Sequence, residues 1–280
     1  MSGDAQAPRA FITGAGSGLG KALALRYASE GWRVAVTDLK LEAAEQTLAE
    51  VCAAGGSGFA AVCDVASEDS FAEVVARLHR EWQGLDLLVN NAGVATAGTV
   101  ADAPLQQWQW VLNINLLGCV RGTRAVLPLL TAQRSGHIVN IASFAGIANP
   151  PAMGSYNAAK AAVISLSETL RFELDPHGIG VSVVCPSFFK TNLLASSRET
   201  APSADNPAPQ MDKIVQRLME KAPITAADVA DAIYQAVRDK RFLVLTHRDD
   251  RKRALIKRLS PELYFRMALK ATAPFLRKQK

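Results

Sequence analysis

The stretch TGAGSGLG, residues 13–20, begins at the end of the apolar run RAFIT and leads into an alanine- and leucine-rich segment. The apolar run predicts a strand, and the segment that starts near Leu19 predicts a helix. Glycines between them let the backbone turn tightly and let a phosphate approach the first amides of the helix. The stretch therefore predicts the first strand–turn–helix unit of an α/β fold. By itself it fits a nucleotide site or a plain turn.

The same alternation of strand and helix continues along the chain. Helices are expected near 41–54, 67–82, 104–133, 153–175 and 225–239. The apolar runs between them, WRVAVTD, GFAAVCDV, LDLLVNNAG, GHIVNIAS, IGVSVVCPS and FLVLT, are expected to be strands. Several of these runs are continuously apolar, as central parallel strands covered on both faces are. The pattern predicts one doubly wound, Rossmann-like α/β domain with helices on both faces of a parallel sheet.

Composition and residue spacing exclude several classes of protein. The 280 residues are 49% hydrophobic and 20% charged, which is typical of a water-soluble globular domain. No apolar run approaches the roughly 20 residues of a membrane-spanning helix. The start of the chain lacks the pattern of a signal peptide, so we expect a cytoplasmic protein. The four cysteines and four histidines are scattered without metal-ligand spacing, and no metal site is expected.

The net charge of +5 is concentrated after residue 247. Residues 1–247 are expected to form the main domain, with a substrate lid over about 187–223, and residues 248–280 a basic amphipathic helical extension. The extension fits a solvated basic face, and it also fits weak contact with an anionic membrane surface. Nothing in the chain resembles a nucleic-acid-binding module, so no nucleic-acid partner is expected.

Asp38 is the main candidate for recognising a nucleotide cofactor bound at the glycine turn. It ends the second expected strand, 18 residues beyond Gly20, where a carboxylate can bind the adenosine ribose hydroxyls of NAD and repel the extra phosphate of NADP. Ser17 occupies a position where a cation would serve that phosphate, although Lys40 lies near. The alternative is that Asp38 caps the helix starting near Leu41. These residues favour NAD as the cofactor.

Two further strand ends are expected at the same edge of the sheet. Asp64 and Val65 follow the third strand, where Asp64 can meet the adenine amine or serve as a turn residue. NNAG, residues 90–93, ends the fourth strand. Its amides and Gly93 can line the cofactor cleft or cap the turn.

A phenol and an ammonium group, Tyr156 and Lys160, lie four residues apart and so share one face of an expected helix. The ordinary pKa of tyrosine is near 10, and an ammonium beside it in a partly dry cleft is expected to lower that pKa. Such a tyrosine can take a proton from an alcohol or return one to a carbonyl. Ser143, which ends the fifth strand, can hold the substrate oxygen. Alone, Tyr156 and Lys160 also fit an aromatic ring with a lysine stem beside it.

Together these motifs resemble the short-chain dehydrogenase/reductase family over about residues 9–192. The resemblance rests on the glycine turn, NNAG, the constellation of Ser143, Tyr156 and Lys160, and CPSFFKT. It implies a single Rossmann domain with a seven-stranded parallel sheet. It also implies a homo-oligomer, tetramer or dimer, formed through the two long helices.

The resemblance assigns roles to residues. Tyr156 is implied to be the general acid/base, Ser143 to steady the substrate oxygen, and Lys160 to lower the pKa of Tyr156 and bind the nicotinamide ribose. Asn115 is implied to hold a water in a proton relay, with Asn113 as the rival match. The expected cofactor-binding residues are Gly14, Ser17, Gly18, Leu19, Gly20, Asp38, Asp64, Val65, Asn91, Ala92, Gly93, Tyr156, Lys160, Pro186 and Thr191. The family has Gly after Pro186, whereas this chain has Ser187.

The expected substrate contacts are mostly apolar. They are Ser143, Phe144, Met153, Phe188 and Phe189, with Val94, Ile147, Leu193 and Leu194 nearby. No arginine is obviously placed for a substrate carboxylate, so we expect an oxidoreductase that transfers hydride between NAD and an apolar secondary alcohol or ketone. The alternatives are an NADPH-preferring carbonyl reductase and a non-catalytic nucleotide-binding scaffold. The complete set of Asn115, Ser143, Tyr156 and Lys160 speaks against the scaffold.

Overall fold

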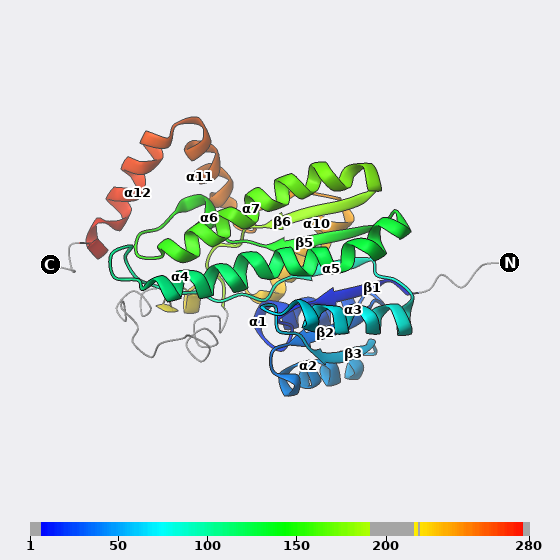
Figure 1. Cartoon of the computed structure of the whole chain (residues 1–280). Helices are drawn as coiled ribbons and strands as arrows, with labels where there is room; N and C mark the ends of the chain where they lie inside the picture. The colour runs from blue at the N-terminus through cyan, green and yellow to red at the C-terminus, as the bar shows by residue number, and fades with distance from the viewer. Residues whose placement is uncertain (1–6, 191–215, 218, 277–280) are drawn as a thin grey trace.

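The computed structural model describes residues 7–190, 216–217 and 219–276, which are built around a seven-stranded sheet (Figure 1). Neighbouring strands run parallel in the order β3-β2-β1-β4-β5-β6-β7. The strands are β1 (Arg9–Ile12), β2 (Arg33–Asp38), β3 (Ser57–Val62), β4 (Leu87–Asn90), β5 (Gly136–Ile141), β6 (Ile179–Val184) and β7 (Leu243–Val244). The doubly wound, seven-stranded parallel sheet expected from the sequence is confirmed.

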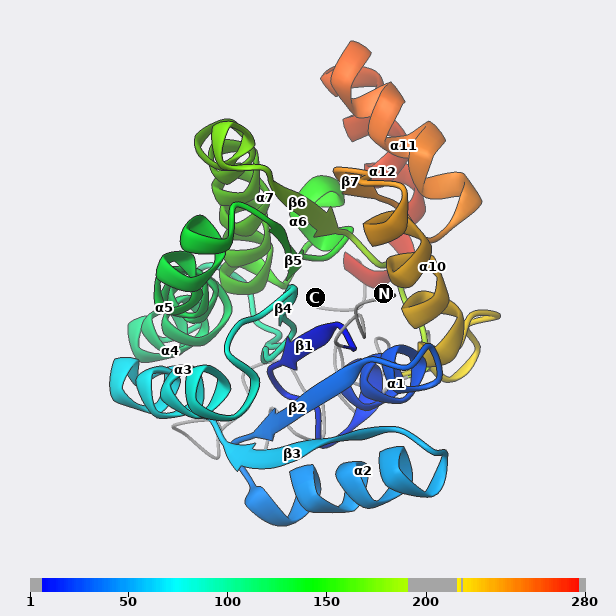
Figure 2. The same ribbon diagram turned by 90° about the vertical axis from the view of Figure 1, so that its right-hand side faces the viewer.

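Helices cover both faces of the sheet (Figure 2). One face carries α1 (Gly18–Ala28), α2 (Leu41–Ala53) and α10 (Ala226–Arg238), and the other carries α3 (Glu68–Trp82), α5 (Gly118–Gln133) and α7 (Gly154–Leu174). Ala10 and Ile12 of β1 are buried in the core cluster on the first face, whereas Phe11 is buried in the cluster on the second. Because both faces are covered, the strand is apolar at every position.

The strand order reverses at β1, whose two neighbours are β2 and β4. In such sheets a crevice opens where the loops after the two central strands diverge, at their carboxyl ends. Thr13 ties these loops together, because its Oγ1 accepts hydrogen bonds from the backbone amides of Asn91 (3.0 Å) and Ala92 (3.1 Å). The topology thus places the glycine turn and the NNAG loop side by side at the crevice.

The long helix expected over 104–133 contains a π-helical turn. Helix α4 (Leu105–Leu112) passes into a π-helical turn, Asn113–Leu117, before α5 begins. The side chain of Asn115 in this turn binds the backbone of Val94, accepting from its amide and donating to its carbonyl at 2.8 Å each. These two buried hydrogen bonds join the π turn to the loop that follows β4. The helical run from Leu105 to Gln133 agrees with the expected helix, but the apolar spacing alone does not reveal the wider turn within it.

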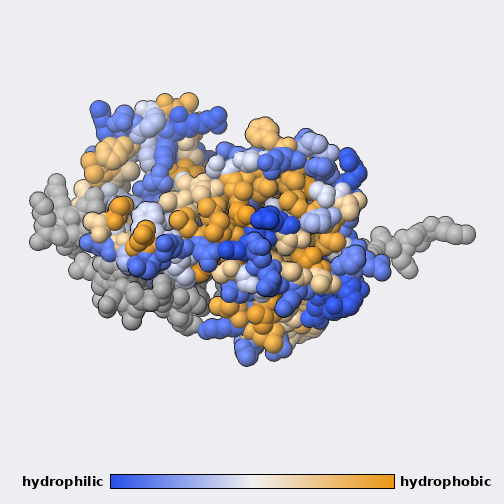
Figure 3. Space-filling view, viewed as in Figure 1, coloured by the Kyte–Doolittle hydropathy of each residue, from blue (hydrophilic) through white to orange (hydrophobic). Residues whose placement is uncertain are grey.

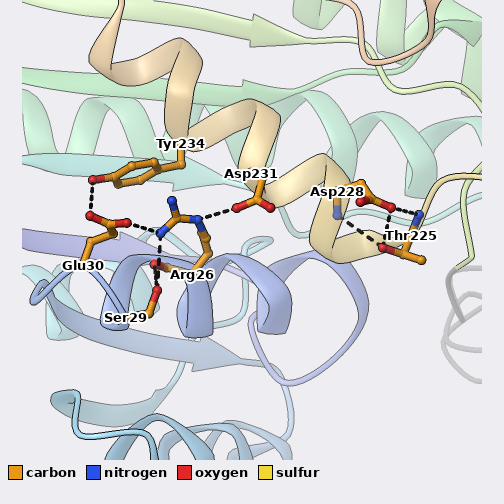
Figure 4. Close-up of polar contacts among 7 residues, drawn as sticks. All are labelled: Arg26, Ser29, Glu30, Thr225, Asp228, Asp231 and Tyr234. Carbon is orange, nitrogen blue, oxygen red and sulfur yellow. Dashed lines mark hydrogen bonds and ion pairs between the residues drawn. The ribbon is translucent and has the colours of Figure 1, made fainter.

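Polar contacts join α1 to α10 (Figure 4). The Arg26 guanidinium binds Glu30 at 2.6 Å and Asp231, and it lies 4.1 Å from the centre of the Tyr234 ring. The Tyr234 hydroxyl donates a hydrogen bond to Glu30 at 2.9 Å. The network spans two helices that are about 200 residues apart in the chain, and it fixes α10 against the glycine-turn helix.

Helix α10 begins with a capping box, which offers a test of local stability (Figure 4). Thr225 Oγ1 accepts from the Asp228 amide at 3.2 Å, and the Asp228 carboxylate accepts from the Thr225 amide at 2.8 Å. Thr225→Ala is expected to lower the free energy of unfolding by about 1 kcal/mol and the thermal midpoint by about 2–4 °C. Thr225→Ser keeps the capping hydroxyl and should match the parent in thermal unfolding followed by circular dichroism. Equal losses in both variants would assign the effect to the lost methyl group instead.

Beyond β7 the chain forms α11 (Arg248–Leu259) and α12 (Pro261–Leu276), together called the helical pair below. The pair projects from the body beside the short helix α6 (Ala145–Ala148) (Figure 1). Lys257 Nζ donates to the Ile147 carbonyl, and the Tyr264 hydroxyl donates to the Ala148 carbonyl at 3.1 Å. Within the part of the chain that the structure describes, no helix combines the length and apolar character needed to cross a membrane.

Candidate active site

The glycine turn is packed so closely that side chains are excluded from two of its positions. Gly14 has φ +62°, and a Cβ added to it would lie 2.9 Å from the Ala92 Cα. A Cβ on Gly20 would lie 2.1 Å from the Gly14 carbonyl oxygen. Helix α1 starts at Gly18, and Ser17 precedes it without capping it through its side chain. A bare backbone cradle at a helix N-terminus fits a diphosphate, as a dinucleotide site requires.

Asp38 lies against this turn rather than capping α2. Its Oδ2 accepts a hydrogen bond from the Gly16 amide at 2.9 Å, and its Oδ1 accepts from the Lys40 amide at 3.2 Å. Lys40 occupies the N-cap position of α2. The capping alternative is therefore wrong, and the carboxylate lines the same cavity as Gly14 and Ser17.

Residues that follow β3 and β4 line the cavity and also make hydrogen bonds that shape their loops. Asp64 Oδ1 accepts from the Ala66 amide at 2.8 Å, as a turn residue does, while Asp64 and Val65 also line the cavity. Asn91 Nδ2 donates to the carbonyls of Thr13 (2.9 Å) and Gly14 (3.1 Å), and so it fastens the NNAG loop to the glycine turn. Sequence reasoning expected only a cleft wall or a cap there. The structure adds this cross-link between two loops.

Ser143, Tyr156 and Lys160 meet at the opposite side of the same cavity. Ser143 follows β5, and its Oγ accepts from the Ala145 amide at 3.1 Å. Tyr156 and Lys160 come from the first turns of α7 and are 7% and 4% exposed. Lys160 Nζ donates to the Ile141 carbonyl at 2.8 Å and lies 5.8 Å from the centre of the Tyr156 ring. The fold therefore brings the three candidate catalytic side chains together.

Burial shifts the pKa of both groups away from the charged forms. The pKa of Tyr156 is raised above its ordinary value, because desolvation outweighs a hydrogen bond with Ser143 that lowers it. The pKa of Lys160 is lowered by the same burial. The sequence led us to expect that Lys160 lowers the pKa of Tyr156. The net shift of the Tyr156 pKa is in the other direction, because burial dominates while Lys160 donates to the Ile141 carbonyl.

Asn115, not Asn113, faces the site. A Cβ placed on Gly93 would lie 3.0 Å from Asn115 Oδ1 and 3.5 Å from Lys160 Nζ, so these three residues enclose one small space. Asn113 instead accepts a hydrogen bond from Arg121 at 2.7 Å through its side chain. The side chain of Asn115 already holds the backbone of Val94. Its role in a water relay stays a prediction.

The cavity has a volume of about 1110 Å³ and runs from Asp38, past Tyr156, to the helical pair. Its wall includes Phe144, Met153, Phe188 and Phe189, which the sequence predicted as substrate contacts. Ile147 does not line the cavity, although its carbonyl holds Lys257. Thr191, Leu193, Leu194 and most of the expected lid lie outside the described residues. The expected cofactor-binding residues Gly18, Leu19, Ala92 and Pro186 also line the cavity, whereas Gly20 does not.

Sequence reasoning missed the contribution of the helical pair to this wall. Tyr264, Phe265 and Ala268 line the cavity, as do two cations, Arg253 and Lys257. The sequence showed no sign of an arginine placed for a substrate carboxylate, and Arg253 is an arginine on the cavity wall. The spacing of Tyr264, Phe265 and Ala268 on one helix face was the available signal. Among the described residues, no group of His, Cys, Asp and Glu is arranged to hold a metal ion.

Known proteins are similar to this chain in sequence. The model of the family described as short chain dehydrogenase matches residues 8–202. The probable oxidoreductase EphD of Mycobacterium tuberculosis is 36% identical over 236 residues, which are 82% of this chain and 39% of that protein. This chain thus spans about two fifths of that relative. The 2-(R)-hydroxypropyl-CoM dehydrogenase of Xanthobacter autotrophicus is 35% identical over 228 residues, or 80% of this chain and 88% of that protein.

A solved structure shares the fold as well. The crystal structure of a short-chain dehydrogenase/reductase from Burkholderia phymatum, in complex with NAD, matches with a TM-score of 0.86 and 33% identity. The match covers 92% of this chain and 95% of that one. The resemblance seen in the sequence motifs is confirmed by these matches. This chain belongs to the short-chain dehydrogenase/reductase family.

Proposed function

We propose that this protein is an oxidoreductase that transfers a hydride between NAD and an apolar secondary alcohol or ketone. The observation that carries the proposal is the single cavity shared by the glycine turn, Asp38 and the group of Ser143, Tyr156 and Lys160. A cofactor cradle and a proton-transfer group in one space are what this chemistry requires. The bound NAD in the Burkholderia phymatum structure supports the choice of cofactor.

The chain's own residues hold the cofactor in this proposal. The glycine turn at the start of α1 binds the diphosphate, and Asp38 accepts hydrogen bonds from the adenosine ribose hydroxyls. Asn91 and Gly93 form the wall beside the nicotinamide half, and Lys160 binds its ribose. The bound cofactor supplies or accepts the hydride.

Proton transfer falls to Tyr156. Burial raises its pKa and so favours the phenol, which can donate a proton to a carbonyl oxygen in the reducing direction. In the oxidising direction it must lose that proton before it can accept one from the alcohol. Ser143 donates a hydrogen bond to the same oxygen and stabilises the negative charge that develops there. Lys160, held by the Ile141 carbonyl beneath the ring, places a cation near the phenol.

The lining of the cavity supports an apolar substrate. Phe144, Met153, Phe188, Met219 and Phe265 form its walls beyond Tyr156. The Xanthobacter autotrophicus relative is named for a 2-hydroxypropyl substrate, which is a secondary alcohol. A carbonyl reductase that prefers NADPH is the second candidate, because Lys40 lines the cavity beside Asp38.

A homologous series of secondary 2-alkanols and 2-ketones tests the proposed substrate class. We expect turnover with NAD⁺ or NADH, followed by absorbance of the reduced nicotinamide, and kcat/KM that rises about fourfold for each added methylene. Matched polyols are the control and should be poor substrates. A preference for polyols over alkanols of equal length would overturn the substrate class, and absence of turnover with every alcohol and ketone would overturn the enzymatic function.

A further inference from the structure

The helical pair differs in charge from the rest of the protein. Residues 248–280 contain 11 Lys and Arg against 3 Asp and Glu, whereas residues 1–247 contain 20 against 23. The net positive charge of the protein is therefore confined to this short segment, and the remaining body is slightly acidic. Such an asymmetry indicates a surface built for an anionic partner.

Large apolar side chains are exposed on the same two helices. Leu255 and Leu259 on α11 are 56% and 75% exposed, and Leu263 at the start of α12 is 50% exposed. The first two lie one helical turn apart and so share a face. None of the three lines the cavity, whose wall takes Ile256 and Tyr264 from the same two helices instead. These three leucines, called the outer stripe below, are thus exposed apolar side chains that lie outside the cavity wall.

Cations flank this outer stripe. Lys252 lies three residues before Leu255, and Arg258 lies three residues after it, so both neighbour the stripe on α11. Arg266 stands in the same relation to Leu263 on α12. None of the three cations forms an ion pair with another described residue. Figure 3 shows hydrophilic and hydrophobic surface interleaved over the projecting pair.

Exposed leucines beside cations favour a lipid surface as the partner of the helical pair. Leucines among lysines and arginines suit the boundary of a bilayer, where the apolar side chains enter the acyl region and the cations reach the headgroups. A second copy of this chain would suit the stripe less well, because a symmetric contact would bring two basic faces together. An anionic lipid surface satisfies both the exposed leucines and the excess of positive charge.

The cavity opens next to this surface. Phe265, Met267 and Leu269 line the cavity and are still 59%, 48% and 47% exposed. They form an apolar rim between the outer stripe and the interior, because the same helix contributes to both. An apolar substrate dissolved in a bilayer would meet this rim on leaving the membrane.

We propose that the outer face of the helical pair, formed by Leu255, Leu259 and Leu263 with Lys252, Arg258 and Arg266, docks the protein on anionic lipid surfaces. Docking is peripheral and reversible, since it depends on side chains of an interfacial helix pair. It requires no turnover, and it therefore stands or falls separately from the proposed enzymatic function.

Co-sedimentation of the full-length protein with vesicles tests the proposal. We expect binding to phosphatidylcholine vesicles that contain about one third phosphatidylserine, much weaker binding to pure phosphatidylcholine, and loss of binding at about 0.5 M salt. The triple variant K252Q/R258Q/R266Q should bind roughly 100-fold more weakly, at about fivefold for each cation. L255Q/L259Q/L263Q should also lose at least tenfold, because the acyl region no longer gains apolar side chains.

Matched controls separate this surface from general charge effects. R80Q/R124Q/R241Q removes three exposed cations from the body and should bind vesicles as the parent does. Circular dichroism and NAD⁺ binding verify that each variant is folded. The proposal is overturned if the parent does not co-sediment with vesicles or if it binds both lipid compositions equally. It is also overturned if R80Q/R124Q/R241Q loses as much vesicle affinity as K252Q/R258Q/R266Q. It is equally overturned if L255Q/L259Q/L263Q still binds vesicles but light scattering shows it to be a smaller oligomer than the parent.

Discussion

Tyr156→Phe is expected to lower kcat by about 10³-fold, in the range that general acid–base catalysis contributes. The variant keeps the ring that packs beside Met153 and Ala95 and removes only the proton-carrying oxygen. Binding of NAD⁺, followed by fluorescence, should therefore change little. Steady-state oxidation of the best alcohol from the homologous series is the measurement. Turnover at the parent rate would remove Tyr156 from the mechanism.

A second tyrosine on the same cavity is the control. Tyr264→Phe loses only the hydrogen bond to the Ala148 carbonyl, and its kcat should stay within about tenfold of the parent, since that bond is worth about 1 kcal/mol.

The dependence of kcat/KM on pH gives a second test of Tyr156. The phenolate needed for oxidation becomes more abundant as the pH rises toward the pKa of Tyr156, which burial raises. In the parent, kcat/KM for oxidation should therefore rise with pH about tenfold per unit below that pKa, and the Tyr156→Phe variant should lack this rise.

Features that depend on local sequence could be predicted. Ala10, Phe11 and Ile12 are apolar in succession because β1 is covered on both faces, and the close approach of Gly14 and Gly20 excludes any other residue. Strand–helix alternation then fixes the sheet and the edge at which the candidate site gathers. Fold and site location were therefore accessible from the chain alone.

Features that depend on packing between distant segments could not be predicted. The π turn at Asn115 exists because the backbone of Val94, 21 residues earlier, binds that side chain. The pKa of Tyr156 rises because the surrounding fold desolvates it, whereas the sequence showed only the neighbouring Lys160. Arg253 reaches the cavity because α11 is fastened to α6, and nothing in its own neighbourhood signals that contact.

Asp38 is expected to give the parent at least about 100-fold tighter binding of NAD⁺ than of NADP⁺, because juxtaposed like charges cost several kcal/mol. The extra phosphate of NADP⁺ would lie beside a carboxylate that the Gly16 amide holds at 2.9 Å. Moving that carboxylate aside breaks a hydrogen bond. The preference should therefore depend on the charge of Asp38 and on its fixed position.

Asp38→Asn separates these two contributions, because it keeps the shape and an oxygen that can accept from the Gly16 amide while it removes the charge. We expect its NADP⁺ affinity to rise about 10- to 100-fold, and its NAD⁺ affinity to fall less than tenfold, since one charge-assisted hydrogen bond becomes a neutral one. Asp64→Asn is the matched control: it neutralises another carboxylate on the cavity wall, and its ratio of NAD⁺ to NADP⁺ affinity should equal that of the parent. Fluorescence titration of the three proteins with both cofactors gives the ratios. If the parent binds NADP⁺ as tightly as NAD⁺, Lys40 compensates for Asp38, and the NADPH-preferring reductase becomes the better description.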